Sequence, residues 1–228
     1  MKNTHSFFVL SLIAVMALFN ACTDEPTIPT TVTDIDGNVY HTVTIGTQVW
    51  MVENLKTTKY RNGDPIPNVT DNLNWSNLTT GAYCNYNNNS NNSTTYGRLY
   101  NWYAVNDNRN IAPTGWHIPS DAEWDILKTF LGDPNTAGGK LKETGTSHWL
   151  SPNTGATNEY NFTGLPGEWR SNVDGSFSPL GGCNGYWWSG TEKDASSSWF
   201  RNVNYNAATI YIFYTHKASA ASVRCVKD

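Results

Sequence analysis

The chain has few charged residues, few cysteines and no long apolar run. Lysine and arginine together number 15 in 228 residues, the formal net charge is −4, and no basic cluster occurs. Proteins that bind nucleic acid concentrate positive charge on one face, so this composition excludes an ordinary nucleic-acid-binding protein. A helix that spans a bilayer needs about 20 apolar residues. The sequence contains no such stretch and predicts no membrane-spanning helix.

Sequence motifs for metal and cofactor sites are also absent. There is no Cys-x4-Cys pair, no zinc-finger spacing of cysteine and histidine, and no pair of histidines at i and i+4. The segment from Asp34 to Gly37 is no EF-hand, since its glycine comes too early and no glutamate ends the loop. We therefore expect no metal and no cofactor. The dispersed histidines are interpreted as surface or structural residues: His41, His117, His148 and His216.

The N-terminus has the organisation of an export signal. Lys2 precedes an apolar run from Phe7 to Phe19, which is the order of a secretory signal peptide. Small Ala21 then stands directly before Cys22. The segment Phe19-Asn20-Ala21-Cys22 resembles the lipobox that the lipoprotein signal peptidase cuts. We interpret residues 1–21 as a lipoprotein signal peptide and Cys22 as the lipid attachment site, with a diacylglyceryl thioether and an acyl chain such as palmitate.

This interpretation predicts an outer-membrane lipoprotein of the cell envelope. Asp24 and Glu25 resemble a surface-export signal of some Gram-negative lineages, which adds the hypothesis of display on the cell surface. Residues 22–33 are rich in proline and threonine and predict an extended tether, followed by one domain over 34–228. An odd number of cysteines then remains in an oxidising compartment, and we expect one disulfide and one buried thiol among them: Cys84, Cys183 and Cys225.

The first half of the domain predicts short strands and loops. Asp36-Gly37 between β-formers predicts a hairpin turn, and residues 39–45 alternate as a strand does. The Asn-, Ser- and Thr-rich stretch from Leu73 to Thr95 predicts a long exposed loop. A short helix is predicted over 96–105, because Leu99, Trp102 and Tyr103 have helical spacing.

The most specific local signal is a helix start at Ser120. Ser120 with Glu123 three residues later is a capping box, and Gly132 is placed to end the helix. A second short helix is predicted over 137–143, and from 162 onward the chain looks β-rich, with a last strand over 221–226. The order of elements predicts an α+β domain. The predicted buried face of the first helix comprises Trp124, Leu127 and Leu131 beside Ile126 and Phe130.

Six segments occur in a characteristic order along the chain. They are Asp36-Gly37-Asn38-Val39-Tyr40, then Ile45-Gly46-x-Gln48-Val49-Trp50-Met51-x-Glu53-Asn54-Leu55, then Tyr96-Gly97-Arg98-Leu99-Tyr100-Asn101-Trp102, then Ala112-Pro113-x-Gly115-Trp116-His117-x-Pro119-Ser120-Asp121-x-Glu123-Trp124, then Gly185-Tyr186-Trp187-Trp188-Ser189, and finally Val223-Arg224-Cys225-Val226-Lys227-Asp228. Together they resemble the Fibrobacter succinogenes major paralogous domain, from about Asp34 to Asp228.

A more distant resemblance concerns the fold. The segments 115–124 and 222–226 are similar to segments of the formylglycine-generating enzyme and its sulfatase-modifying relatives. The resemblance implies a C-type-lectin-like α+β fold, with two short helices packed on twisted antiparallel β-sheets and long loops. Segments shared at this distance are structural, so they carry an expectation of fold and not of activity. An enzyme of that superfamily is a minor alternative.

We expect a non-catalytic module that binds an extracellular ligand, with carbohydrate as the first candidate. Aromatic rings pack on sugar rings, and the candidate contacts are Trp169, Trp187 and Trp188. Neighbours in a strand point to opposite faces, so at most one residue of the pair Trp187 and Trp188 is expected to face solvent. The alternative is a structural or adhesive surface scaffold that binds protein partners.

Overall fold

A computed structural model describes residues 30–179 and 181–228, together with Met1. The predicted lipid attachment at Cys22, the rest of the predicted signal peptide and residues 22–29 of the tether lie outside the described residues. Over the described range the chain forms short helices and mostly antiparallel strands, so the predicted α+β class is confirmed.

The elements follow one another along the chain as short segments. The strands are β1 (Thr31–Thr33), β2 (Val39–Ile45), β3 (Gln48–Met51), β4 (Tyr83–Cys84), β5 (Leu99–Asn101), β6 (Trp116–His117), β7 (Asn184–Glu192), β8 (Ser197–Asn204), β9 (Tyr211–His216), β10 (Ala220–Ala221) and β11 (Val226–Lys227). The helices are α1 (Asn72–Ser76), the 3-10 helix η1 (Tyr86–Asn88), α2 (Asn92–Tyr96), α3 (Trp102–Val105), α4 (Asp121–Leu131) and α5 (Ala137–Leu141).

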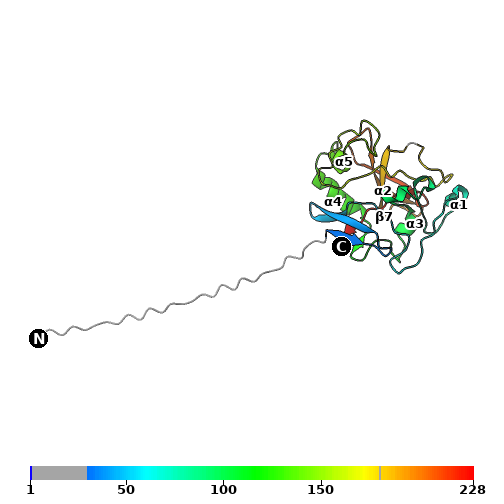
Figure 1. The fold of residues 1–228 in the computed structure, drawn as a ribbon, viewed down its shortest axis with the longest axis horizontal. Coiled ribbons are helices and arrows are strands. Elements are labelled where there is room, and N and C mark those ends of the chain that lie inside the picture. The colour runs from blue at the N-terminus through cyan, green and yellow to red at the C-terminus, as the bar shows by residue number, and fades with distance from the viewer. Residues whose placement is uncertain (2–29, 180) are drawn as a thin grey trace.

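The named strands form three sheets with antiparallel pairing. A five-stranded sheet has the order β1-β2-β3-β11-β6, and two three-stranded sheets have the orders β10-β5-β4 and β7-β8-β9. Strand β11 lies between β3 and β6, so the C-terminal end of the chain packs beside the first strands of the domain, as Figure 1 shows. Helix α4 packs against β7.

The first hairpin confirms the predicted turn and corrects the tether. Asp34 Oδ1 accepts from the backbone N–H groups of Asp36 and Asn38 at 2.9 Å each. Gly37 takes the positive φ of 84° that the turn requires. Strand β1, however, pairs with β2 residue by residue, so residues 31–33 belong to the folded domain and not to the tether. Their backbone groups find partners on β2, which overrides the tether prediction made from composition.

Helix α4 begins as its capping box predicts. Glu123 N donates to Ser120 Oγ at 3.3 Å, and Ser120 N donates to Glu123 Oε2 at 2.8 Å. Gly132 follows with a φ of 85°. The predicted buried face was partly wrong, because Ile126 and Phe130 are about half exposed. At about 100° per residue these two positions point away from the face that Trp124, Leu127 and Leu131 bury.

The stretch 73–95 is only in part the exposed loop that its composition predicts. It contains β4, η1 and most of α1 and α2. Trp75 is fully buried, and its indole N–H donates to Ala218 O at 2.9 Å. Tyr83, Cys84 and Tyr86 are buried as well. A few apolar side chains spaced among many polar ones therefore hold this segment against the domain.

Three further predictions change in detail. The region 96–105 divides into strand β5 and helix α3, because Leu99 and Tyr100 pair with β4 and β10. Helix α5 ends at Leu141, two residues before the predicted end. The predicted last strand is two short strands, β10 and β11, that belong to different sheets. In each case pairing with residues distant in the chain accompanies the boundary, as in the bridge of Lys142 to Gly164 after α5, and local periodicity does not contain such pairing.

Candidate functional site

The candidate site lies on one face of the sheet β7-β8-β9. The register places Trp188 opposite Phe200, and Phe200 opposite Phe213. Side chains two residues apart on a strand share a face, so Tyr186 lies on the same face. The ring centroids are 5.4 Å apart between Tyr186 and Phe200, and 5.9 Å apart between Phe200 and Phe213. The sheet therefore presents a row of aromatic rings.

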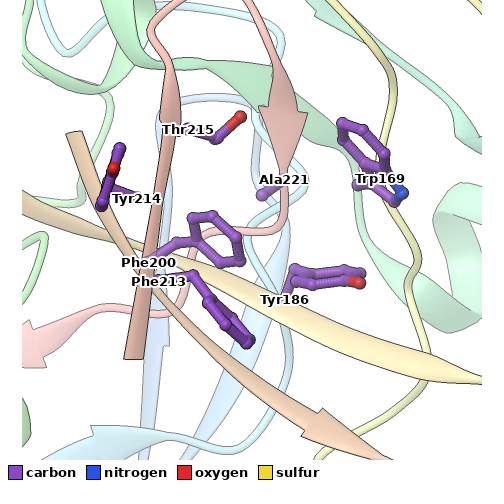
Figure 2. Close-up of a pocket in the computed structure, with 7 residues that line it drawn as sticks. All are labelled: Trp169, Tyr186, Phe200, Phe213, Tyr214, Thr215 and Ala221. Carbon is purple, nitrogen blue, oxygen red and sulfur yellow. The ribbon is translucent and has the colours of Figure 1, made fainter. Parts of the chain in front are cut away.

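Trp169, from the loop before β7, extends this row into a pocket. Its ring lies 6.4 Å from that of Tyr186 by centroids, at an interplanar angle of 60°. Figure 2 shows both rings at one end of the pocket, with Phe200 and Phe213 beside them. The pocket has a volume of about 240 Å³. Its lining residues are Trp169, Tyr186, Phe200, Phe213, Tyr214, Thr215 and Ala221.

Two buried charged residues hold Trp169 in place. Glu168 is fully buried and has a φ of 58°, which is uncommon for a residue with a side chain. Its Oε1 accepts from the backbone N–H groups of Cys183 and Asn184 at 2.8 and 3.0 Å. Burial raises the pKa of the Glu168 carboxyl, against the effect of these hydrogen bonds. The tight bend at Glu168 fixes the direction in which the Trp169 side chain leaves the chain.

Arg170 holds the other side of Trp169. It is fully buried, and its guanidinium donates to Gly175 O, Val69 O and Thr70 O at 2.6–2.9 Å. Its backbone N–H and C=O also bond to Ala220 of strand β10. Because Ala221, the next residue, lines the pocket, the same contacts place Trp169 next to the pocket floor.

The pocket is mainly apolar, with hydroxyl groups at its margin. Burial raises the pKa of Tyr186 to about 12, and the negative charge of Glu168 contributes to this rise. The Tyr186 hydroxyl therefore stays protonated at neutral pH. Thr215 Oγ1 lies 3.0 Å from Ser219 Oγ, which donates to Asn172 Oδ1 at 3.1 Å. An aromatic pocket with a few polar groups is a usual form of small-ligand site.

Of the three predicted ligand contacts, only Trp169 lines the pocket. Trp187 and Trp188 are 1% and 0% exposed. Their indole N–H groups donate to Asn54 Oδ1 and Tyr100 O, both at 2.8 Å. Both are therefore core residues, so their prediction as ligand contacts was wrong, while the expectation that at most one of them faces solvent holds. The two faces of β7 at this position pack against different core clusters, so alternation buries both rings.

The disulfide prediction was wrong. Cys84, Cys183 and Cys225 are all free and buried. Cys84 and Cys225 belong to different core clusters. Burial raises the pKa of Cys84 to about 12 and raises the pKa of Cys225 further. A neutral buried thiol packs as a small apolar side chain.

Three histidines lie beside carboxylates near the surface, and His216 Nδ1 accepts from Ala218 N at 3.1 Å. His41 lies 2.7 Å from Glu53, and His148 lies 2.8 Å from Glu143. His117 bridges Glu123 and Asp228, each at 2.7 Å. Within residues 30–179 and 181–228, no three side chains of His, Cys, Asp or Glu come together as a metal site would require.

Sequence reasoning missed Tyr186, Phe200 and Phe213, which form most of the pocket. The available signal was the run Tyr211-Ile212-Phe213-Tyr214, which places aromatic rings on both faces of one strand. The polar segment 73–95, which was expected to be a loop, does not line the pocket.

The comparisons with known proteins give one match. The family model described as the Fibrobacter succinogenes major domain matches residues 43–227. No curated protein and no solved structure matches the chain. In the part of the chain that the structure describes, no helix has the length and apolar character needed to cross a membrane.

Proposed function

This chain belongs to the Fibrobacter succinogenes major domain family, and we propose that it is a lipid-anchored module of the cell envelope that binds an extracellular ligand. A carbohydrate is the first candidate ligand. The observation that carries the proposal is the open aromatic pocket formed by Trp169, Tyr186, Phe200 and Phe213.

The chemistry of the pocket suits a sugar ring. The face of an aromatic ring carries partial negative charge and attracts the positively polarised C–H groups on one side of a pyranose. Trp169 and Tyr186 meet edge to face, so a sugar ring that lies across both contacts two aromatic side chains. The hydroxyls of Tyr186 and Thr215 are positioned at the lining for hydrogen bonds to sugar hydroxyls.

Several features support binding without catalysis. A glycosidase needs two carboxyl groups that face each other across the substrate. Glu123 takes part in the helix cap, and Glu168 accepts backbone hydrogen bonds inside the protein. Asp121 pairs with Arg201 at 2.7 Å, and Glu192 pairs with Lys217. Each of these acids has a structural partner away from the aromatic pocket.

The proposed anchor is a lipid chain on Cys22. Strand β1 begins at Thr31, so eight residues separate Cys22 from the strand. An extended chain spans at most about 3.6 Å per residue, so the folded domain stays within about 30 Å of the lipid surface. Mass spectrometry of the mature protein tests this part. An unmodified N-terminus that begins elsewhere than at Cys22 would refute it.

We extend the proposal to the finer architecture, a C-type-lectin-like form. The support is the antiparallel arrangement of all three sheets, the packing of α4 against β7, and the long irregular connections between elements. An experimental structure that superimposes on no C-type lectin would reject this part and leave the ligand proposal intact.

A glycan array with the full-length chain in detergent tests the ligand. Clear hits are expected, and Trp169→Ala should weaken them about tenfold, the effect of losing about 1.4 kcal/mol of aromatic contact. Ile126→Ala is the matched control, because Ile126 is a half-exposed apolar residue on α4 that does not line the pocket. A blank array, or equal losses in both variants, would count against carbohydrate binding at this site.

A second candidate function is a surface scaffold that binds proteins. The observation in its favour is β9, an edge strand whose large apolar residues are exposed. Binding of the chain to a matrix protein that survives Trp169→Ala, together with a blank glycan array, would favour the scaffold.

A further inference from the structure

Strand β9 is an edge without the usual protection. It ends the sheet order β7-β8-β9, and it contains no proline, lysine or acidic residue. Four consecutive large residues are 37–57% exposed: Tyr211, Ile212, Phe213 and Tyr214. Soluble proteins usually blunt such an edge with charge, proline, a bulge or a covering segment, because free N–H and C=O groups recruit another strand. An exposed apolar edge of this length is typical of an interaction site.

The register identifies which backbone groups of β9 are free to pair. Lys217 N donates to Ser196 O at 2.9 Å, so the pair 196 and 217 is hydrogen-bonded. Bonded and non-bonded pairs alternate in an antiparallel ladder. Residues 211, 213 and 215 therefore bond to β8, and Ile212 and Tyr214 direct their backbone groups outward. His216 agrees with this alternation, because its C=O accepts from Ser219 N instead of from β8.

We propose that two copies of this chain pair through β9 as antiparallel strands, with Phe213 of each copy on the two-fold axis. In this register Ile212 of one copy lies opposite Tyr214 of the other. Both outward N–H groups and both outward C=O groups of each strand then have a partner. Registers shifted by two residues leave some of them unpaired or place them against His216, whose C=O is already occupied.

The charges around β9 include one pair of opposite sign that this arrangement brings closer together. Tyr214 borders the pocket, but its side chain alternates with those of Phe213 and Thr215 and so points to the opposite face of β9. There Lys193 Nζ lies 3.9 Å from the centroid of the Tyr214 ring. On the same face, Ile212 and Asp125 border one hollow, and the Asp125 side chain is 59% exposed. Pairing Ile212 with Tyr214 of the second copy brings Lys193 of that copy toward Asp125. The two-fold axis repeats this contact. Asp125 also lies 3.4 Å from Arg201 of its own chain, and Lys128 borders the same hollow, so the charge on this side of β9 is mixed.

The second copy also completes the aromatic pocket, a consequence that rests on the proposed function. Residues 211, 213 and 215 share the face of the pocket, and Thr215 and Phe213 line it. In the proposed register, Tyr211 of the second copy lies opposite Thr215, and the two Phe213 rings meet. The open side of each pocket, at β9, then gains two aromatic walls, and two pockets lie side by side for a repetitive ligand.

Disulfide crosslinking tests the register. The two Phe213 residues form a non-hydrogen-bonded pair, with Cα atoms about 4.5 Å apart. A Phe213→Cys chain in detergent with oxidised glutathione should therefore form a covalent dimer. Ile212→Cys is the matched control on the same strand, because its counterpart lies two residues away, at about 8 Å and beyond disulfide reach. Wild-type protein controls for the native cysteines. Crosslinking of Ile212→Cys as fast as Phe213→Cys would overturn the register.

Sedimentation velocity of the full chain in detergent tests the pairing itself. Wild type should sediment as a dimer, and Ile212→Lys should raise the dimer dissociation constant at least about tenfold, because lysine protects an edge strand. Lys193→Asp and Asp125→Lys should each weaken the dimer, and the double exchange should restore it. A wild-type chain that stays monomeric at all concentrations would overturn the proposal. A wild-type monomer that binds an extended peptide, with this binding lost in Ile212→Lys, would also overturn it.

The ligand proposal and the pairing proposal can be refuted independently of each other. Ile212 points away from the pocket, so Ile212→Lys removes the second copy without altering the lining of the first. Glycan binding that is unchanged in this variant would reject the completed pocket and keep the ligand proposal. A stable dimer that binds no glycan would reject the ligand proposal and keep the pairing.

Discussion

Asn54 accepts hydrogen bonds from three buried N–H groups, one of Trp187 and two of Arg224. Its replacement should destabilise the domain strongly. Asn54 is 4% exposed, and its Oδ1 accepts from Trp187 Nε1 at 2.8 Å and from Arg224 Nε and Nη2 at 3.1 and 2.6 Å. Arg224 is fully buried, and its guanidinium also stacks 4.2 Å from the Phe162 ring centroid. Burial lowers the pKa of Arg224 to about 9, so the group remains charged at neutral pH.

The magnitude follows from the donors that Asn54→Leu leaves without a partner. Leucine has a similar volume but no acceptor. An unsatisfied buried neutral donor costs about 1–3 kcal/mol. Arg224 keeps its hydrogen bond to Phe162 O, but two N–H groups of this buried charge lose their acceptor, which costs more than the loss at a neutral donor. The two effects share one acceptor and do not add fully, so we expect a total loss of about 3–5 kcal/mol. Domains of this kind are stable by about 5–15 kcal/mol, so the variant should be close to unfolding.

Urea unfolding followed by tryptophan fluorescence measures this loss. The control is Asn206→Leu, an exposed asparagine whose replacement should change stability by less than about 0.5 kcal/mol. The double variant Asn54→Leu with Arg224→Met removes acceptor and charge together. It should lose less stability than the sum of the two single variants, because the buried charge is then absent. A loss below about 1 kcal/mol for Asn54→Leu alone would refute the reasoning.

Three further outcomes are expected. Burial lowers the pKa of His117, but the hydrogen bonds that its ring N–H groups donate to the carboxylates of Asp228 and Glu123 outweigh this effect, and the net pKa is raised above 6.5. Its contribution to stability is therefore complete below about pH 6.5 and lost as pH rises through the folded-state pKa. Urea midpoints across this range should show the loss, and His117→Gln should flatten it. Ser120→Ala removes the cap of α4 and should cost about 1 kcal/mol; an unchanged midpoint would contradict the capping role. Cys84 should resist thiol reagents in the folded protein and react after unfolding, because burial raises its pKa to about 12; reaction at the rate of a free thiol in the native state would contradict its burial.

The sequence alone determined features that depend on residues a few positions apart. The capping box at Ser120, the glycine after α4 and the Asp-Gly hairpin turn follow from local hydrogen bonds and backbone preferences, and all three are confirmed. The six ordered segments also identified the family, because a family pattern is a property of sequence order. The cell-envelope location inferred from Cys22 also rests on a short local motif, and it stays a prediction.

Tertiary structure decided which aromatic residues are core and which are surface. Alternation on β7 predicts opposite faces for Trp187 and Trp188, but only the packing of different clusters on the two faces shows that both are buried. The pocket likewise depends on Trp169, which reaches Tyr186 and Phe200 only because buried Glu168 and Arg170 fix its loop. These contacts join residues far apart in the chain. Their free energy comes from burial and pairing in the folded state, which no local pattern of residues contains.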